Sequence, residues 1–121
     1  MPNLWQILCE ILMVPTLPRF CFHLAELDNW PSIQGYGLLP ASRLMDRAGL
    51  SGASREALER NRRDQRTVLS DGSVIRDNKP LPVAALERCL IGMNPAEWFA
   101  LLNSKVFFWF DLDRLDRQTW Y

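Results

Sequence analysis

The 121-residue sequence has few of the residues from which most metal and catalytic sites are built. It contains one histidine, His23, and three cysteines, none of them spaced as Cys-x-x-Cys. A structural zinc ion needs about four cysteine or histidine ligands, so no metal is expected. Nucleophile-elbow and glycine-rich phosphate motifs are also missing. The sequence therefore predicts neither a hydrolase triad nor a phosphate loop.

An excess of charge of either sign is absent as well. Fourteen lysines and arginines balance fourteen aspartates and glutamates, so no overall field draws the chain to nucleic acid or to anionic lipid. A local basic patch is still possible, and nucleic-acid binding through it is a weaker hypothesis than the two functions named at the end of this section. The patch would comprise Arg55, Arg60, Arg62, Arg63 and Arg66.

Long apolar runs are lacking too. The longest near the N-terminus, residues 4–14, is well short of the ~20 residues that cross a bilayer, and it lacks the features of a signal peptide. No membrane partner is expected. The three cysteines, Cys9, Cys21 and Cys89, lie in apolar stretches and are predicted to be buried free thiols. This usage predicts a reducing, cytoplasmic location.

The length and the 48% hydrophobic content fit a single domain. We expect residues 1–18 to form an N-terminal helical extension and residues 19–121 to form one α+β domain. Short strands are predicted at residues 19–25, 67–69, 73–76 and 105–110, and the last reads as a central strand covered on both faces. They imply a small mixed sheet with several helices.

Helices are predicted from the apolar spacing and from their start and stop residues. Asp28 and Gly37 bound the first, Pro40 and Gly49 the second, and Asp111 begins the last. A strongly charged helix over residues 53–63 is either a solvated face or a phosphate-contacting patch. Two more helices are expected at residues 82–91 and after Asn94, whose side chain fits a capping box with Glu97.

Two side chains stand out as candidates for binding. Strand alternation places His23 on the same face as Cys21 and Ala25. The imidazole is either hydrogen-bonded inside the fold or a donor to a ribose or amide at the edge of a cleft. Arg76 lies on a short strand, where it can clamp a phosphate or pair with Asp77 or another neighbour.

Several segments together resemble an uncharacterised bacterial domain family over residues 19–117. They are Phe22-His23-Leu24-Ala25, Asn29-Trp30-Pro31-Ser32-Ile33, Gly37-Leu38-Leu39, Val74-Ile75-Arg76-Asp77 with Lys79-Pro80, Trp98 with Leu101-Leu102-Asn103, and Val106-Phe107-Phe108-Trp109.

The opening segments are also similar to the DNA-thymidine ADP-ribosyltransferase toxins and to the ADP-ribosyltransferase fold. That resemblance implies that His23 and Asn29 hold NAD, the substrate, and that Arg76 approaches a phosphate. It makes residues 107–109 the second core strand. The chain departs from the pattern at Ala25, where the toxins carry threonine, and no residue matches the late catalytic glutamate.

Two functions therefore remain open. The first is NAD binding of the ADP-ribosyltransferase kind by a partial, C-terminally short fold that is catalytically incomplete. The second is a non-enzymatic interaction module that self-associates as a homodimer through Trp5, Ile11, Trp120 and an unpaired sheet edge. The sequence does not decide whether the chain is an enzyme.

Overall fold

The computed structural model of the chain describes residues 20–78 and 82–119. The predicted N-terminal helix over residues 1–18 lies outside these residues. The chain divides into two compact units with their own internal contacts. Among the described residues, the terminal unit joins residues 20–23 with residues 108–119, and the central unit lies within residues 24–107.

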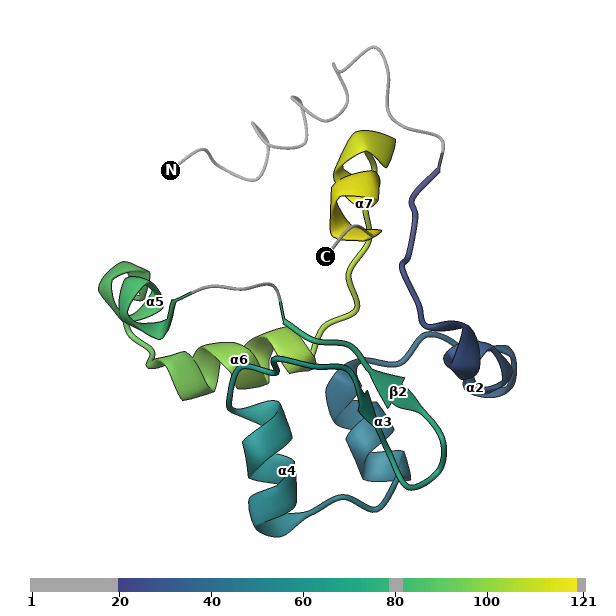
Figure 1. Cartoon of the computed structure of the whole chain (residues 1–121), viewed down its shortest axis with the longest axis horizontal. Coiled ribbons are helices and arrows are strands. Elements are labelled where there is room, and N and C mark those ends of the chain that lie inside the picture. The colour runs from purple at the N-terminus through teal and green to yellow at the C-terminus, as the bar shows by residue number, and fades with distance from the viewer. Residues whose placement is uncertain (1–19, 79–81, 120–121) are drawn as a thin grey trace, which may run out of the picture. The chain divides into compact units, whose positions relative to one another are not determined.

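The central unit combines helices with one β-hairpin (Figure 1). A 3-10 turn, η1 (Leu27–Asn29), leads into α2 (Trp30–Tyr36), and α3 (Ala41–Arg47) and α4 (Gly52–Glu59) follow. The hairpin strands are β1 (Thr67–Val68) and β2 (Val74–Ile75), and α5 (Val83–Cys89) and α6 (Pro95–Asn103) complete the unit. The α+β class expected from the sequence is confirmed.

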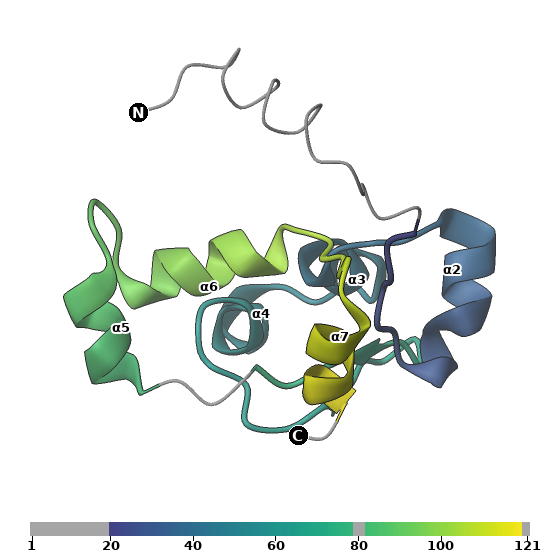
Figure 2. The ribbon, with the colours of Figure 1, turned by 90° about the horizontal axis from the view of Figure 1, so that it is seen from above.

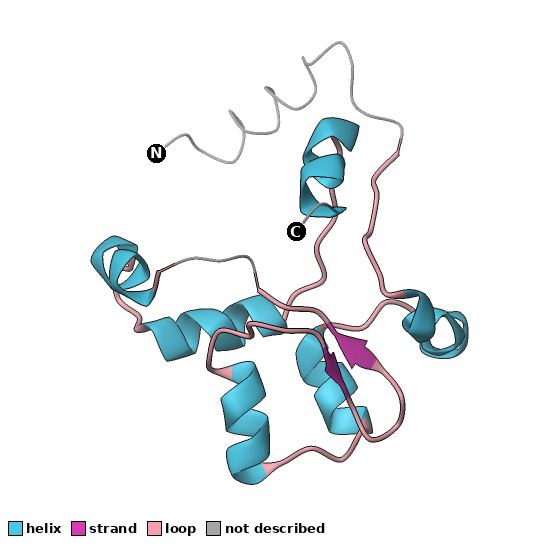
Figure 3. Cartoon of the chain, in the orientation of Figure 1, coloured by secondary structure: helices cyan, strands magenta, loops and turns pink. Residues whose placement is uncertain are grey.

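The hairpin follows from its turn residues. Gly72 has a φ of 87°, which glycine adopts without the steric penalty that a Cβ would bring. Thr67 then pairs with Ile75 and Val68 with Val74 in antiparallel register. Figure 3 shows how short these strands are beside the loops that flank them. Local turn chemistry, rather than a long ladder, sets this pairing.

Two other helices begin or end at the predicted residues, whereas Asp28, the predicted start of the first helix, lies within η1 and α2 begins only at Trp30. Pro40 precedes α3, and Gly49 takes a φ of 73° just after it. Asn94 accepts a hydrogen bond from the Glu97 backbone N–H, and Glu97 accepts one from the Asn94 N–H, so the predicted capping box is confirmed.

The charged helix is shorter than expected. It ends at Glu59, four residues before the predicted end at Arg63. The backbone N–H of Arg63 instead donates to Asn78 Oδ1 at 2.6 Å, and the Asn78 N–H donates to the Arg63 carbonyl at 3.0 Å. These long-range bonds replace the helical ones, which is why the local pattern overestimates the helix.

The core of the central unit lies between α3 and the hairpin. Met45 is fully buried and packs with Leu69 and Ile75. Partly buried side chains surround these three: Ala41, Leu44, Ala48, Leu50 and Leu58. Helical spacing predicts an inward stripe of Ala41, Leu44, Met45 and Ala48 on α3, and this stripe is confirmed. Of the inward pair predicted for α4, Leu58 packs here, but Ala57 is exposed, so that prediction is wrong for Ala57.

Helix α6 contacts α3 and α4 and runs crosswise to them (Figures 1 and 2). Its buried residues are Phe99 and Asn103, one turn apart. The spacing of its apolar residues predicts an inward face of Trp98, Leu101 and Leu102, but this is wrong for Leu101, which is exposed. The face is rotated because the polar Asn103 points inward, for a reason given below.

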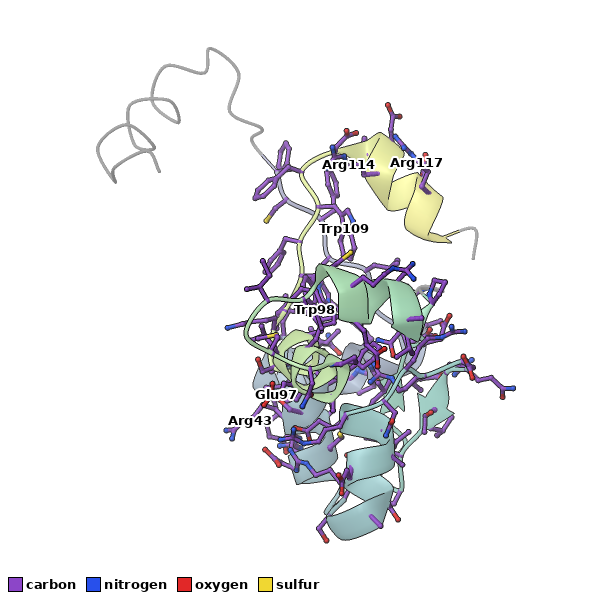
Figure 4. The ribbon with its side chains drawn as sticks, turned by 90° about the vertical axis from the view of Figure 1, so that its left-hand side faces the viewer. Arg43, Glu97, Trp98, Trp109, Arg114 and Arg117 are labelled. Atoms are coloured by element: carbon purple, nitrogen blue, oxygen red, sulfur yellow. The ribbon has the colours of Figure 1, made fainter. Side chains whose placement is uncertain are left out.

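The terminal unit contains an antiparallel bridge between Phe22 and Trp109 and helix α7 (Leu112–Thr119). The Asp113 N–H donates to Asp111 Oδ1 at 2.9 Å, so Asp111 starts the helix as predicted. Arg114 and Arg117 extend from α7 (Figure 4).

Two expectations about burial are wrong. The apolar pattern around Trp30 predicts a core side chain, but Trp30 is 54% exposed. The free thiols of Cys21 and Cys89 are exposed rather than buried. Cys9 lies outside the described residues. Within the described ranges, no helix is both long and apolar enough to cross a bilayer.

Candidate functional site

The segment that carries His23 is extended and pairs with the segment that carries Trp109. The Phe22 N–H donates to the Trp109 carbonyl at 2.7 Å, and the Trp109 N–H donates to the Phe22 carbonyl at 2.8 Å. This is the doubly bonded pair of an antiparallel ladder. Alternation then turns Phe22 toward partial burial and His23 outward, as expected for a strand.

The imidazole of His23 is exposed and lies beside an aromatic ring. Its centroid is 5.7 Å from that of Phe108, with an angle of 54° between the planes. Of the two alternatives drawn from the sequence, a sealed core histidine does not fit this exposure. The pair offers a hydrogen-bonding ring and an apolar face next to each other.

Residues 105–110 are less covered than a central strand would be. Phe107, Phe108 and Phe110 are all exposed, and among the described residues the segment is bridged only at Trp109. The prediction of a strand covered on both faces is therefore wrong. Its apolar composition is typical of a covered strand, but among the described residues few side chains pack against it.

Asn29 is tied to the hairpin. Its Nδ2 donates to the Val74 carbonyl at 2.8 Å, and the Val74 N–H donates to its Oδ1 at 2.7 Å. The side-chain amide thus occupies both backbone groups of a strand residue, which would otherwise be unpaired on that edge. In this arrangement, Asn29 fixes where the chain turns from the extended segment into α2.

Arg76 makes an ion pair with a neighbour other than Asp77. Its Nε lies 3.6 Å from Glu26 Oε1, and both side chains are partly exposed. The phosphate-clamp alternative stays untested. Two interactions thus connect the turn before α2 to the hairpin: Asn29 bonds to Val74 of β2, and Glu26 pairs with Arg76, the residue after β2.

The three residues assigned to NAD by the resemblance are not all in one unit. Asn29 and Arg76 belong to the central unit. Asn29 bonds to Val74 of β2, and Arg76, which follows β2, pairs with Glu26 before η1. His23 belongs to the terminal unit. Within the described ranges, no group of three or more acidic, histidine or cysteine side chains is placed to hold a metal ion.

Sequence reasoning missed a buried polar cluster around Arg63, which is only 8% exposed. Its Nη1 donates to Asn103 Oδ1 and to the Leu58 carbonyl, both at 2.9 Å, and its Nε donates to the Arg76 carbonyl at 2.9 Å. Asn103 Nδ2 in turn donates to the Glu59 carbonyl at 2.7 Å. This network explains why α6 turns Asn103 inward.

Burial lowers the pKa of the Arg63 guanidinium, and the nearby charge of Asp77 offsets part of that effect. An arginine stays protonated throughout the accessible pH range, so the domain holds a cation that is almost wholly enclosed. Nothing local in the run around Arg63 separates it from its exposed neighbours.

Comparison with known families gives one match. A family model described as "Family of unknown function (DUF7002)" covers residues 19–120. The chain belongs to this family. No curated protein and no solved structure matches it. The match confirms the resemblance to an uncharacterised domain family and assigns no activity to it.

Proposed function

We propose that this DUF7002 chain binds NAD through the His23 segment, in the manner that the ADP-ribosyltransferase resemblance implies. The observation that carries the proposal is the Phe22–Trp109 bridge. It joins the segment that carries His23 to the segment that the resemblance makes the second core strand, although the two lie at opposite ends of the domain sequence.

The chemistry at this bridge suits the nicotinamide end of the dinucleotide. An imidazole can bond a ribose hydroxyl or a carboxamide, and the ring of Phe108 offers a face on which nicotinamide can stack. A transferase also needs an acid to stabilise the positive charge that develops at the ribose. No residue of the chain matches that acid, so the proposed activity is binding without transfer.

The other two assigned residues have different parts in this proposal. Asn29 would not contact the ligand but would hold the backbone in place, because its side-chain amide is already bonded to the backbone of Val74. Arg76 would contact a phosphate only by giving up or sharing its 3.6 Å ion pair with Glu26. The proposed ligand contact is therefore His23, with Asn29 as a positioning residue. A reducing, cytoplasmic setting is proposed from the two exposed free thiols.

A thermal-shift titration tests the proposal. NAD at about ten times its dissociation constant should stabilise the fold by about 1.4 kcal/mol, which corresponds to roughly 5 °C for a domain of this size. His23→Ala should remove the shift, whereas Cys21→Ala, on the same exposed face of the segment, should keep it. A wild-type chain that shows no shift with millimolar NAD would contradict the proposal.

A second candidate, self-association as a homodimer, is favoured by the exposed apolar side chains of the terminal unit. Phe20 is 72% exposed and Phe110 is 65% exposed, and large apolar patches mark interfaces more often than free surface. Sedimentation of the wild type should show a dimer that Phe110→Asp dissociates. Ile91→Asp, at an exposed site of the central unit, should leave it intact. A wild-type monomer at every concentration would exclude this candidate.

A further inference from the structure

The segment that carries Trp109 has one paired edge and one open edge. The Phe22–Trp109 bridge is doubly bonded, so the backbone groups of Trp109 point toward Phe22. Successive residues of a paired strand turn their backbone groups to opposite sides, so those of Phe108 and Phe110 point away from Phe22. Among the residues that the structure describes, neither of these two makes a backbone hydrogen bond. The edge at Phe108 is therefore open to another strand.

The residues along this open edge favour strand pairing. Residues 106–110 are all valine, phenylalanine or tryptophan, the β-branched and aromatic types that strands prefer, and they include no charge and no proline. Phe108 is 46% exposed and Phe110 is 65% exposed. An exposed apolar edge of this kind is a template for pairing with another chain. The chain bends at Phe110, so we expect a short ladder centred on Phe108.

Opposite charges flank this edge at equal distances from Phe108. Lys105 lies three residues before Phe108, and Asp111 lies three residues after it. Both are exposed, and none of the ion pairs between described residues includes either of them. In an antiparallel pair of identical segments centred on Phe108, Lys105 of each copy lies opposite Asp111 of the other. Opposite charges at facing positions stabilise an antiparallel pair, so the segment is complementary in charge to a second copy of itself.

We propose that two copies of this chain pair antiparallel along residues 105–111, with Phe108 opposite Phe108 of the second copy. This inference rests on the homodimer candidate above and names the surface at which the two copies meet. The register agrees with the open edge, because Phe108 exchanges both backbone hydrogen bonds with its counterpart, and Val106 does so with Phe110 of the second copy. Both copies use the same edge, and the other edge of the segment is already bridged to Phe22. The contact therefore closes as a dimer.

Sedimentation of charge variants of the full chain tests this register. Lys105→Glu places like charges opposite each other at both ends of the ladder, and Asp111→Lys does the same with the other sign. Each variant should weaken the dimer roughly tenfold. An equimolar mixture of the two should regain the wild-type affinity, because each mixed dimer again has opposite charges at both ends. Arg114→Glu is the matched control: it makes the same charge change as Lys105→Glu at an exposed site of α7 (Figure 4) and should leave the dimer unchanged.

Amide hydrogen exchange of the wild type gives a second readout that needs no variant, because Asp111→Lys also removes the acceptor at the start of α7. The Phe108 amide should exchange more slowly as the protein concentration rises. The Trp109 amide, which is bonded to Phe22 within each copy, should change much less. A wild-type dimer whose Phe108 exchange is independent of concentration, or a mixture of folded variants that stays as weak as its components, would overturn this pairing and leave the homodimer candidate standing. A monomer at every concentration would overturn both.

Discussion

The side-chain amide of Asn29 pairs with the backbone of Val74 as a neighbouring strand residue would. One bond runs in each direction, at 2.8 and 2.7 Å, across 45 positions of sequence. The resemblance to NAD-binding proteins would make Asn29 a ligand contact. The geometry gives it a positioning task, because its amide oxygen and one amide N–H already have protein partners.

Replacing Asn29 should therefore cost stability. Asn29→Ala leaves the N–H and the carbonyl of Val74 without their partners, and we expect a loss of about 1–3 kcal/mol in the free energy of unfolding. Asn29→Asp should recover only part of it, since a carboxylate accepts from the N–H but cannot donate to the carbonyl. Urea unfolding measures both losses of stability from the shift in the midpoint, when the slope of the unfolding free energy against urea concentration is unchanged.

The control for this pair is Asn61→Ala. Asn61 is exposed and makes one long bond of 3.3 Å to the Glu56 carbonyl, so its replacement should change stability by less than about 0.5 kcal/mol. Equal losses at positions 29 and 61 would show that the Asn29–Val74 pair contributes nothing specific.

Asn103 should be more sensitive still. Asn103→Ala removes the acceptor of Arg63 Nη1 and the donor to the Glu59 carbonyl in a site that is 4% exposed. The cation would then be buried with one partner fewer, at an expected cost of about 2–4 kcal/mol. Thermal unfolding followed by circular dichroism measures the loss. Ser104→Ala, the exposed next residue, should leave the melting temperature almost unchanged.

The capping box at the start of α6 predicts a smaller effect. Asn94→Ala removes the acceptor for the Glu97 N–H, and caps of this kind contribute about 1 kcal/mol. Glu97→Gln keeps an oxygen that can accept from the Asn94 N–H. Guanidinium unfolding should rank wild type and Glu97→Gln together above Asn94→Ala. The reverse ranking would contradict the capping geometry.

The hairpin turn predicts a pH dependence. The Ser73 hydroxyl donates to Asp71 and is the main reason why the pKa of this carboxyl lies below its ordinary value. Burial opposes that effect, and the hydrogen bond from the Ser73 backbone N–H adds a smaller lowering. A carboxyl whose pKa is lowered by folding adds stability above its unfolded pKa, and that stability is lost as the pH falls through the folded pKa. Ser73→Ala should raise the pKa of Asp71 in an NMR titration and reduce the acid sensitivity of unfolding. An unchanged Asp71 titration in that variant would refute the assigned cause.

Features set by neighbouring residues could be predicted from the sequence. The pair Asp71-Gly72 indicates the hairpin turn. Asn94 and Glu97 indicate the start of α6, and Asp111 indicates the start of α7. Each depends on bonds within a few positions of the chain, so the residue types alone carry the information. Strand alternation likewise places His23 on one face with Cys21 and Ala25, but the exposure of that face could not be predicted from the sequence.

Features set by distant residues could not be predicted. Arg63 is enclosed because Asn103, 40 positions away, bonds to its Nη1, and nothing in the arginine-rich run distinguishes it from Arg60 or Arg62. The structural role of Asn29 likewise depends on a distant residue, Val74. The apolar run at residues 105–110 misleads for the opposite reason: its composition is typical of a covered strand, yet the described residues cover little of it.

The central claim, that the exposed imidazole of His23 contacts NAD, has a direct test. The chain has one histidine, so a carbon–proton NMR spectrum contains a single imidazole Cε1–H signal. The position of that signal reports whether the imidazole is free or bound to NAD. Titration with NAD should shift this signal and the amide signal of Phe108 along one saturable curve. An imidazole signal that stays in place at millimolar NAD, while the folded spectrum is unchanged, would contradict the claim.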